Sequence, residues 1–220
     1  MTTCEQTVTV DYTPCVGVNY HGHFYDAVRI GYQCWLKENL RNETDAADHA
    51  IADYHAYQDN TTYFNQFGYL YSWYSAVGVT EGDVYASPAT HIADNGTEYV
   101  QGICPAGWAV PSQNDVSVLN TTAGDVSVLK EASTEYWLPG LEGVYPGTGF
   151  NARGGGRYNA ALHRYEDRLA AFHFWESNHT MGSLSIESAC IYLSCNSVLI
   201  VEPNQKNDRK NVRCIRKVAP

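Results

Sequence analysis

The chain has 220 residues, of which 44% are hydrophobic and 17% are charged, a composition that suits one large globular domain and excludes a disordered chain. Its formal net charge of -10 argues against nucleic acid as a partner, because nucleic-acid binding needs a basic footprint. No run approaches the roughly 18 apolar residues that a membrane-spanning helix needs, so direct membrane insertion is not expected.

The N-terminal residues 1–27 are predicted to form an arm of strands. Apolar and polar residues alternate there in two runs separated by Pro14 and Gly22, the pattern of half-buried strands. The segments 28–30 and 33–36 follow and are predicted to form a strand pair, or one bent strand, that enters a main domain spanning residues 28–218.

Two helices are predicted in the middle of the chain. Residues 67–77 carry apolar side chains at spacings of three and four, which predicts an amphipathic helix. Ser112 with Asp115 three positions later is typical of a helix N-cap, and Val116 and Leu119 continue a second, short helix. The polar segment 41–65 is expected to be mostly loop, and the glycine-containing segment 78–101 an insertion loop.

The last third of the chain is predicted to consist of short strands separated by turns rich in Gly and Asn. The candidate strands are residues 150–153, 172–175, 189–193, 198–201 and 212–218. Helices followed by several short strands predict an α+β fold.

Four motifs in a fixed order make the chain resemble a known family. They are Ile-Gly-Tyr-Gln-Cys-Trp-Leu-Lys-Glu-Asn-Leu at 30–40, Phe-Gly-Tyr-Leu-Tyr-Ser-Trp-Tyr at 67–74, Cys-Pro-Ala-Gly-Trp-Ala-Val-Pro-Ser at 104–112 and Asn-Val-Arg-Cys-Ile-Arg at 211–216. Together they resemble the Fibrobacter succinogenes major paralogous domain, a family of bacterial surface and phage-associated modules. The resemblance implies a C-type-lectin-like fold with two helices and a small antiparallel sheet system, in which residues 28–30 pair with 212–218. It also implies a binding role with no enzymatic activity.

Seven cysteines, none in a Cys-x-x-Cys pair, favour disulfides in an oxidising compartment over a zinc site. The resemblance implies a bridge between Cys104 and Cys214, which would close a loop of about 110 residues. Cys4 and Cys15 are predicted to form a local pair in the N-terminal arm. These expectations, with the family resemblance, place the protein outside the cell, at a cell surface or on a phage particle.

No cofactor is expected, although a structural calcium ion stays open. The tripeptide Glu202-Pro203-Asn204 is the one that mannose-type C-type lectins use to bind calcium and sugar hydroxyls together. Calcium needs six to eight oxygens, and the Trp-Asn-Asp segment that completes the site in those lectins does not follow here. A proline turn between two strands is therefore the favoured interpretation of this tripeptide.

Residues 157–200 are the candidate binding region. By analogy with family members that are variable proteins of diversity-generating retroelements, this region would be rewritten between copies while Trp175 and 212–215 keep the scaffold. Ordinary fixed specificity is the alternative. Ten side chains are expected to be exposed on one face and to contact a protein or glycan ligand on a cell surface, with Phe174, Ile191 and Leu193 facing the core. They are Tyr158, His163, Tyr165, His173, Glu176, Asn178, His179, Tyr192, Ser194 and Asn196.

Two other functional classes stay open. One is a structural subunit of a pilus or cell surface, whose surfaces would contact partner strands. The other is an oxidase related to formylglycine-generating enzymes, which need a reactive cysteine pair or copper ligands in a cleft, and Cys190 with Cys195 is the only close pair. The sequence lacks a Gly-x-Ser-x-Gly motif, so a hydrolase of that type is not predicted.

Overall fold

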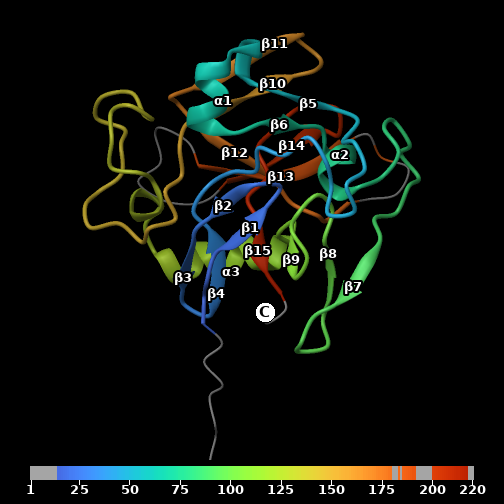
Figure 1. The fold of residues 1–220 in the computed structure, drawn as a ribbon. Helices are drawn as coiled ribbons and strands as arrows, with labels where there is room; N and C mark the ends of the chain where they lie inside the picture. Colours follow the sequence, from blue (N-terminus) through green and yellow to red (C-terminus); the bar gives the residue numbers. More distant parts are fainter. Residues whose placement is uncertain (1–13, 180–182, 184, 192–199, 218–220) are drawn as a thin grey trace, which may run out of the picture.

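A computed structural model describes residues 14–179, 183, 185–191 and 200–217, with only the backbone described for 185–191 and 200–204. The structure is α+β, as predicted, with three α-helices and several small sheets within these residues. In Figure 1 the β10–β11 hairpin and α1 lie at one end of the molecule, and β3, β4, β15 and α3 lie towards the other. No helix among the described residues is long and apolar enough to cross a membrane.

The first part of the chain forms two hairpins. Strands β1 (Val18–Tyr20) and β2 (His23–Tyr25) pair with each other, and β3 (Ala27–Ile30) pairs with β4 (Gln33–Leu36). Tight turns join them, at His21-Gly22 and Gly31-Tyr32. Gly31 has a φ of +58°, a conformation that glycine adopts without steric cost. The expected pairing of residues 28–30 with 33–36 is therefore confirmed.

The C-terminal strand joins this second hairpin to form a four-stranded sheet in the order β3-β4-β15-β9. Strand β15 (Ile215–Arg216) pairs with β4 on one side and with β9 (Trp108–Ala109) on the other. The expected direct pairing of residues 28–30 with the C-terminal strand is wrong. The turn at Gly31 folds β4 back between β3 and β15, so that β4 is the strand in contact with the C-terminus.

A five-stranded sheet carries the candidate binding region, in the order β11-β10-β12-β13-β14. Its strands are β10 (Gly155–Asn159), β11 (Arg164–Arg168), β12 (Phe172–Trp175), β13 (Ser185–Ile191) and β14 (Ile200–Gln205). Only β10 and β12 pair in parallel; the other neighbours are antiparallel. The predicted strand at 172–175 is confirmed to the residue. The tripeptide Glu202-Pro203-Asn204 lies inside β14 and not in a turn, so the predicted proline turn is wrong.

The first predicted helix, at 67–77, is replaced by two shorter helices. Helix α1 (Thr61–Phe67) ends where Gly68 takes a φ of +75°, and β6 (Leu70–Tyr71) follows. Ser72 then caps a new helix, α2 (Trp73–Val77), by accepting a hydrogen bond from the Ser75 amide. The spacing of apolar residues correctly predicted that these side chains are buried, but Gly68 and the Ser72 cap divide the segment into two helices.

The second predicted helix is confirmed as α3 (Gln113–Ala123). Ser112 and Asp115 form a capping box, in which the serine hydroxyl accepts from the Asp115 amide and the Asp115 carboxylate accepts from the Ser112 amide. Val116 and Leu119 are buried, as the amphipathic pattern indicated. The predicted N-terminus of this helix is therefore correct in position and in mechanism.

Segments expected to be loops contain further short elements. Residues 41–65 include β5 (Tyr54–His55), the 3-10 turn η1 (Tyr57–Asp59) and the start of α1, and 78–101 includes the hairpin of β7 (Thr90–Ile92) and β8 (Glu98–Val100). A second 3-10 turn, η2 (Val126–Leu129), follows α3. The strand predicted at 150–153 is reduced to one bridge, between Ala152 and Lys130.

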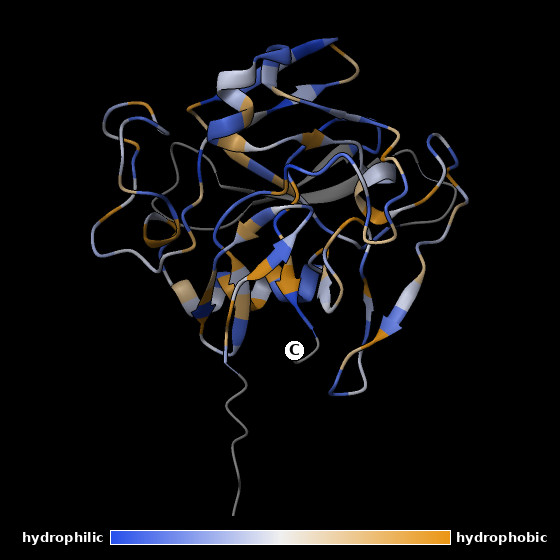
Figure 2. Cartoon of the chain, viewed as in Figure 1, coloured by the Kyte–Doolittle hydropathy of each residue, from blue (hydrophilic) through white to orange (hydrophobic). Residues whose placement is uncertain are grey.

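Tryptophan side chains from the family motifs fill the core. Trp35, Trp73 and Trp175 are completely buried and Trp108 is nearly so. In Figure 2 apolar residues concentrate on the strands of the four-stranded sheet and around α2, whereas the β11 end of the molecule is hydrophilic. Trp175 donates to the backbone oxygen of Tyr71 at 2.7 Å, which ties the five-stranded sheet to the segment before α2.

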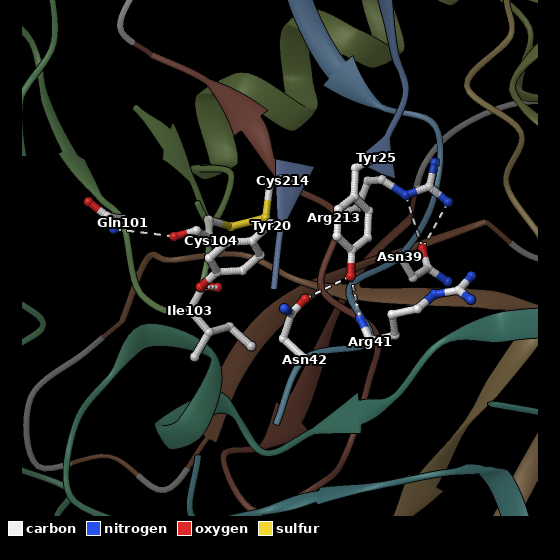
Figure 3. Close-up of a disulfide and its surroundings, with 10 residues drawn as sticks. All are labelled: Tyr20, Tyr25, Asn39, Arg41, Asn42, Gln101, Ile103, Cys104, Arg213 and Cys214. Carbon is white, nitrogen blue, oxygen red and sulfur yellow. Dashed lines mark hydrogen bonds between the residues drawn. A yellow bond between two sulfur atoms is a disulfide. The ribbon is translucent and has the colours of Figure 1, made fainter. Parts of the chain in front are cut away.

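Among the residues that the structure describes, two disulfides join separate segments of the chain. Cys104–Cys214 is present as expected and links the start of the 104–112 motif to the C-terminal motif (Figure 3). The other bridge is Cys15–Cys34, with a Cα–Cα distance of 5.5 Å, so the predicted pairing of Cys4 with Cys15 is wrong. The β1–β2 hairpin folds back on the domain and brings Cys15 beside β4. Cys4 lies outside the described residues.

Arg213 has a structural role in this core. Its guanidinium is buried and donates to the Asn39 side chain at 2.8 and 3.0 Å (Figure 3) and to the backbone oxygens of Leu36 and Phe150. Burial lowers the pKa of the Arg213 guanidinium to about 9, which still leaves it charged at neutral pH. Neutral acceptors that surround the buried charge replace its lost hydration.

Candidate ligand-binding surface

The seven candidate side chains that the structure describes do not share one exposed face. Tyr192, Ser194 and Asn196 lie outside the described residues, as does Leu193, and the side chain of Ile191 is not described. His163 and Asn178 are exposed, and Tyr158, Tyr165 and His179 are half-buried. His173 and Glu176 are buried, which contradicts their expected exposure.

The burial of His173 and Glu176 has a clear cause. Alternating exposure requires a strand with one solvated face, but all four residues of β12 are buried, so both of its faces are covered. Phe174 faces the core as predicted, and His173 on the opposite face contacts Asp167 through Nε2 at 3.1 Å. Glu176 follows the strand, and its backbone oxygen accepts a hydrogen bond from Trp73.

Two of the candidates, the half-buried Tyr158 and the exposed His163, line one hollow, which we call the Tyr158 hollow. It has a volume of about 440 Å³ and lies between the β10–β11 hairpin, the segment before β5 and the segment after β14. Its lining residues are Ala52, Asp53, Glu81, Tyr158, Ala160, His163, Asn207 and Arg209. Its volume lies within the roughly 300–1,000 Å³ range of small-molecule sites.

Arg209 is held in place in this hollow from two sides. Its Nε donates to both carboxylate oxygens of Asp53, at 2.9 and 2.8 Å, and its guanidinium carbon lies 4.6 Å from the centre of the Tyr158 ring. The backbones of Arg209 and Tyr158 also exchange two hydrogen bonds. Within the described part of the chain, the two Nη groups of Arg209 have no hydrogen-bond partner. The hollow thus contains an ordered guanidinium with unused donors.

Carboxylates supply the acceptors of the Tyr158 hollow. Asp53 is bound by Arg209 and lies 3.3 Å from Nε2 of His55. The carboxylate of Glu81 accepts a hydrogen bond from the Ser72 hydroxyl at 2.7 Å. Burial raises the pKa of the Glu81 carboxyl more than the Ser72 hydrogen bond lowers it, and the nearby charge of Asp53 raises it further. Donors and acceptors are therefore both present in the lining of the hollow.

Packed tyrosines support the wall that Tyr158 provides. Tyr165 packs edge-on against Tyr158, with ring centres 5.1 Å apart, and against Tyr57 at 4.9 Å. Tyr57 in turn contacts Tyr63 of α1. Tyr165 was expected to be exposed for binding, but it lies half-buried between two other rings and so holds Tyr158 in position.

Two further candidates, the exposed Asn178 and the half-buried His179, line a second hollow, the His179 hollow, of about 310 Å³. It lies between the β7–β8 hairpin, the start of α3 and residues 177–179. Its lining residues are Thr90, Glu98, Tyr99, Val100, Val110, Ser112, Asp115, Ser177, Asn178, His179 and Lys217. Asn178 accepts a hydrogen bond from the amide of Gln113, and Lys217 pairs with Asp115, so much of this polar lining is used within the protein.

The sequence alone did not indicate Asp53, Glu81 and Arg209. They come from segments treated as loops and from the stretch after β14, and only the fold brings them to the same hairpin. Among the described residues no group of three His, Cys, Asp or Glu side chains is placed to hold a metal ion.

The chain matches the sequence pattern of one family over nearly its full length, while no curated protein and no solved structure matches it. The match covers residues 28–216 and includes all four motifs, both strands next to the C-terminal strand and the Cys104–Cys214 bridge. The chain therefore belongs to the Fibrobacter succinogenes major domain family.

Proposed function

We propose that this protein is an extracellular ligand-binding module, used in receptor recognition or adhesion, whose described binding surface is the Tyr158 hollow. The observation that carries this proposal is that residues 157–179 supply walls to both hollows while the same segment anchors the core. Tyr158 and His163 line one hollow and Asn178 and His179 the other, whereas Trp175 is buried. Side chains at the hollows are therefore open to change without loss of the scaffold.

The separation of hollow-lining side chains from core side chains within one segment suits a diversified binding protein. On this proposal the fold is C-type-lectin-like, residues 157–200 vary between copies under a diversity-generating retroelement, and the module binds a cell-surface ligand without catalysing a reaction. Rigid backbone on both sides of the Tyr158 hollow supports it, because preorganised side chains lose less entropy on binding. Two disulfides support an extracellular location, at a cell surface or on a phage particle.

Binding to intact cells tests the proposal. Fluorescently labelled protein would be incubated with a panel of bacterial species and measured by flow cytometry. Wild type is expected to label at least one species, and a variant with Tyr158→Ala and His163→Ala is expected to lose this labelling. Arg164→Ala is the matched control, since Arg164 is exposed on the same hairpin and does not line the hollow. Equal labelling by wild type and the double variant would refute the assignment of the hollow.

The genomic prediction is separate from the binding prediction. A reverse-transcriptase gene should lie near the coding sequence, together with an imperfect copy of its 3′ end. Population sequencing should place substitutions at adenine positions within codons 157–200 and leave codons 211–216 unchanged. An invariant region across many isolates would exclude diversification, though a binding module with fixed specificity would remain.

A further inference from the structure

The Tyr158 hollow carries groups of both charges, and the Asp53–Arg209 pair leaves part of their hydrogen-bonding capacity unused. Arg209 presents its two Nη groups, which lack a hydrogen-bond partner within the described chain, because its Nε alone is used for Asp53. Opposite charge comes from Asp53 and Glu81 in the same lining. The hollow therefore offers fixed donors and fixed acceptors side by side.

This mixture disfavours a ligand of one charge. An anion at the Nη groups of Arg209 would also face the carboxylates of Asp53 and Glu81, and a cation at those carboxylates would face the guanidinium. Like charges at such short range oppose binding unless they are neutralised. A neutral ligand whose groups both donate and accept meets neither repulsion.

The lining contains no large aliphatic side chain. Only Ala52 and Ala160 are aliphatic, and one face of the Tyr158 ring is covered by Arg209. Peptide ligands usually bind by inserting an apolar or aromatic anchor into an apolar pocket, or by pairing with a strand edge. This hollow offers no large apolar pocket, while Tyr158, His163 and Asn207 add polar groups at its wall.

We propose that the Tyr158 hollow binds a neutral glycan, with vicinal hydroxyls that accept from the Nη groups of Arg209 and donate to the carboxylates of Asp53 and Glu81. Each hydroxyl both donates and accepts, which matches the presence of both donors and acceptors in the lining. Recognition is by side chains directly, without a bridging calcium ion. This inference rests on the proposed ligand-binding function and names the chemical class of the ligand.

The probe is an array of immobilised neutral mono- and oligosaccharides, with wild type and four variants. Wild type is expected to bind at least one sugar in the presence of EDTA. Arg209→Lys keeps the positive charge but loses the planar guanidinium with its paired N–H donors. Glu81→Gln loses the carboxylate. Each is expected to weaken binding about tenfold, equivalent to ~1.4 kcal/mol. Tyr158→Phe is expected to weaken it less, and Arg164→Gln to leave it unchanged.

Cells pretreated with periodate or with protease separate failure of this inference from failure of the proposed function. Periodate cleaves vicinal diols, so loss of cell labelling after periodate but not after protease supports the glycan. A different result would overturn the glycan as the ligand but keep the binding function. In that result, labelling survives periodate, is lost after protease and still depends on Tyr158 and His163. Loss of array binding in EDTA would overturn direct recognition.

A folding defect is controlled in two ways. Circular dichroism and thermal unfolding are recorded for each variant, and Glu81→Gln keeps nearly the same shape at a residue that is exposed overall, although its carboxyl group is partly buried. If Arg209→Lys does not fold, an unchanged affinity of Glu81→Gln and Tyr158→Phe for the bound sugar would by itself overturn the inference. Wild type that binds neither the array nor any cell would refute both the proposed function and its ligand class.

Discussion

Arg209 donates through Nε to both carboxylate oxygens of Asp53, 156 residues away in the chain, at 2.9 and 2.8 Å. Both side chains are mostly buried, with 22% and 16% of their surfaces exposed. The pair fixes the segment before β5 to the segment after β14, and Arg209 also contacts the Tyr158 ring. One ion pair thus orders three parts of the proposed site.

Replacing Asp53 should cost stability as well as binding. Asp53→Asn leaves a mostly buried guanidinium without its counter-charge, and we expect the free energy of unfolding to fall by about 1–3 kcal/mol. Asp26→Asn is the matched control: Asp26 pairs with Lys37 at the surface and is 55% exposed, so its loss should cost about 0–1 kcal/mol. Urea titration measures both, and equal losses would contradict the structural role of the Asp53 pair.

The two disulfides should differ in their contribution to stability. Cys104–Cys214 spans 110 residues and Cys15–Cys34 spans 19, so chain entropy predicts contributions of about 5 and about 3 kcal/mol. Denaturation of the Cys104→Ala/Cys214→Ala and Cys15→Ala/Cys34→Ala variants tests this order. A larger loss in the second variant would show that the chain-entropy account does not hold for this fold.

Glu81 gives the protein a predictable pH dependence. Its pKa is raised in the folded state, so the folded protein binds the proton more tightly than the unfolded chain. The stability it contributes is present below its ordinary pKa of about 4.5 and is lost as pH rises through the raised value. Glu81→Gln should therefore be more stable than wild type at pH 7 and equal to it near pH 4. Thermal unfolding at both pH values checks the sign, and a variant less stable at pH 7 would contradict it.

Core and hollow positions of the same segment should respond differently to substitution. Trp175→Ala removes a completely buried ring and its hydrogen bond to Tyr71, which we expect to cost about 3–5 kcal/mol. His163→Ala at the exposed turn should change stability by no more than about 0.5 kcal/mol. Chemical denaturation compares the two, and a large loss at His163 would show that the hollow is part of the scaffold.

Elements were predictable from the sequence where a local signal set them. The capping box at Ser112 and Asp115 located α3, and the aromatic-rich run at 172–175 located β12. The prediction of one helix at 67–77 was wrong because the spacing of apolar residues indicates which side chains are buried. The backbone conformation is set instead by Gly68, which ends α1, and by Ser72, which caps α2.

The site was only partly predictable, because its residues meet through tertiary structure. Tyr158 and His163 were identified in the binding region, but Asp53, Glu81 and Arg209 carry no local signal of function. His173 and Glu176 were expected to be exposed because strand alternation does not tell whether a sheet has one covered face or two. The Cys15–Cys34 bridge was missed because sequence proximity favoured Cys4, whereas the β1–β2 hairpin sets the geometry.

The central claim is that a cell-surface ligand occupies the Tyr158 hollow. Hydrogen–deuterium exchange of the protein, alone and saturated with envelopes from a species that it labels, tests this most directly. We predict slower exchange in peptides that cover residues 52–53, 160–163 and 207–209, three segments that line this hollow. Slower exchange confined to other peptides, with these three unchanged, would contradict the claim.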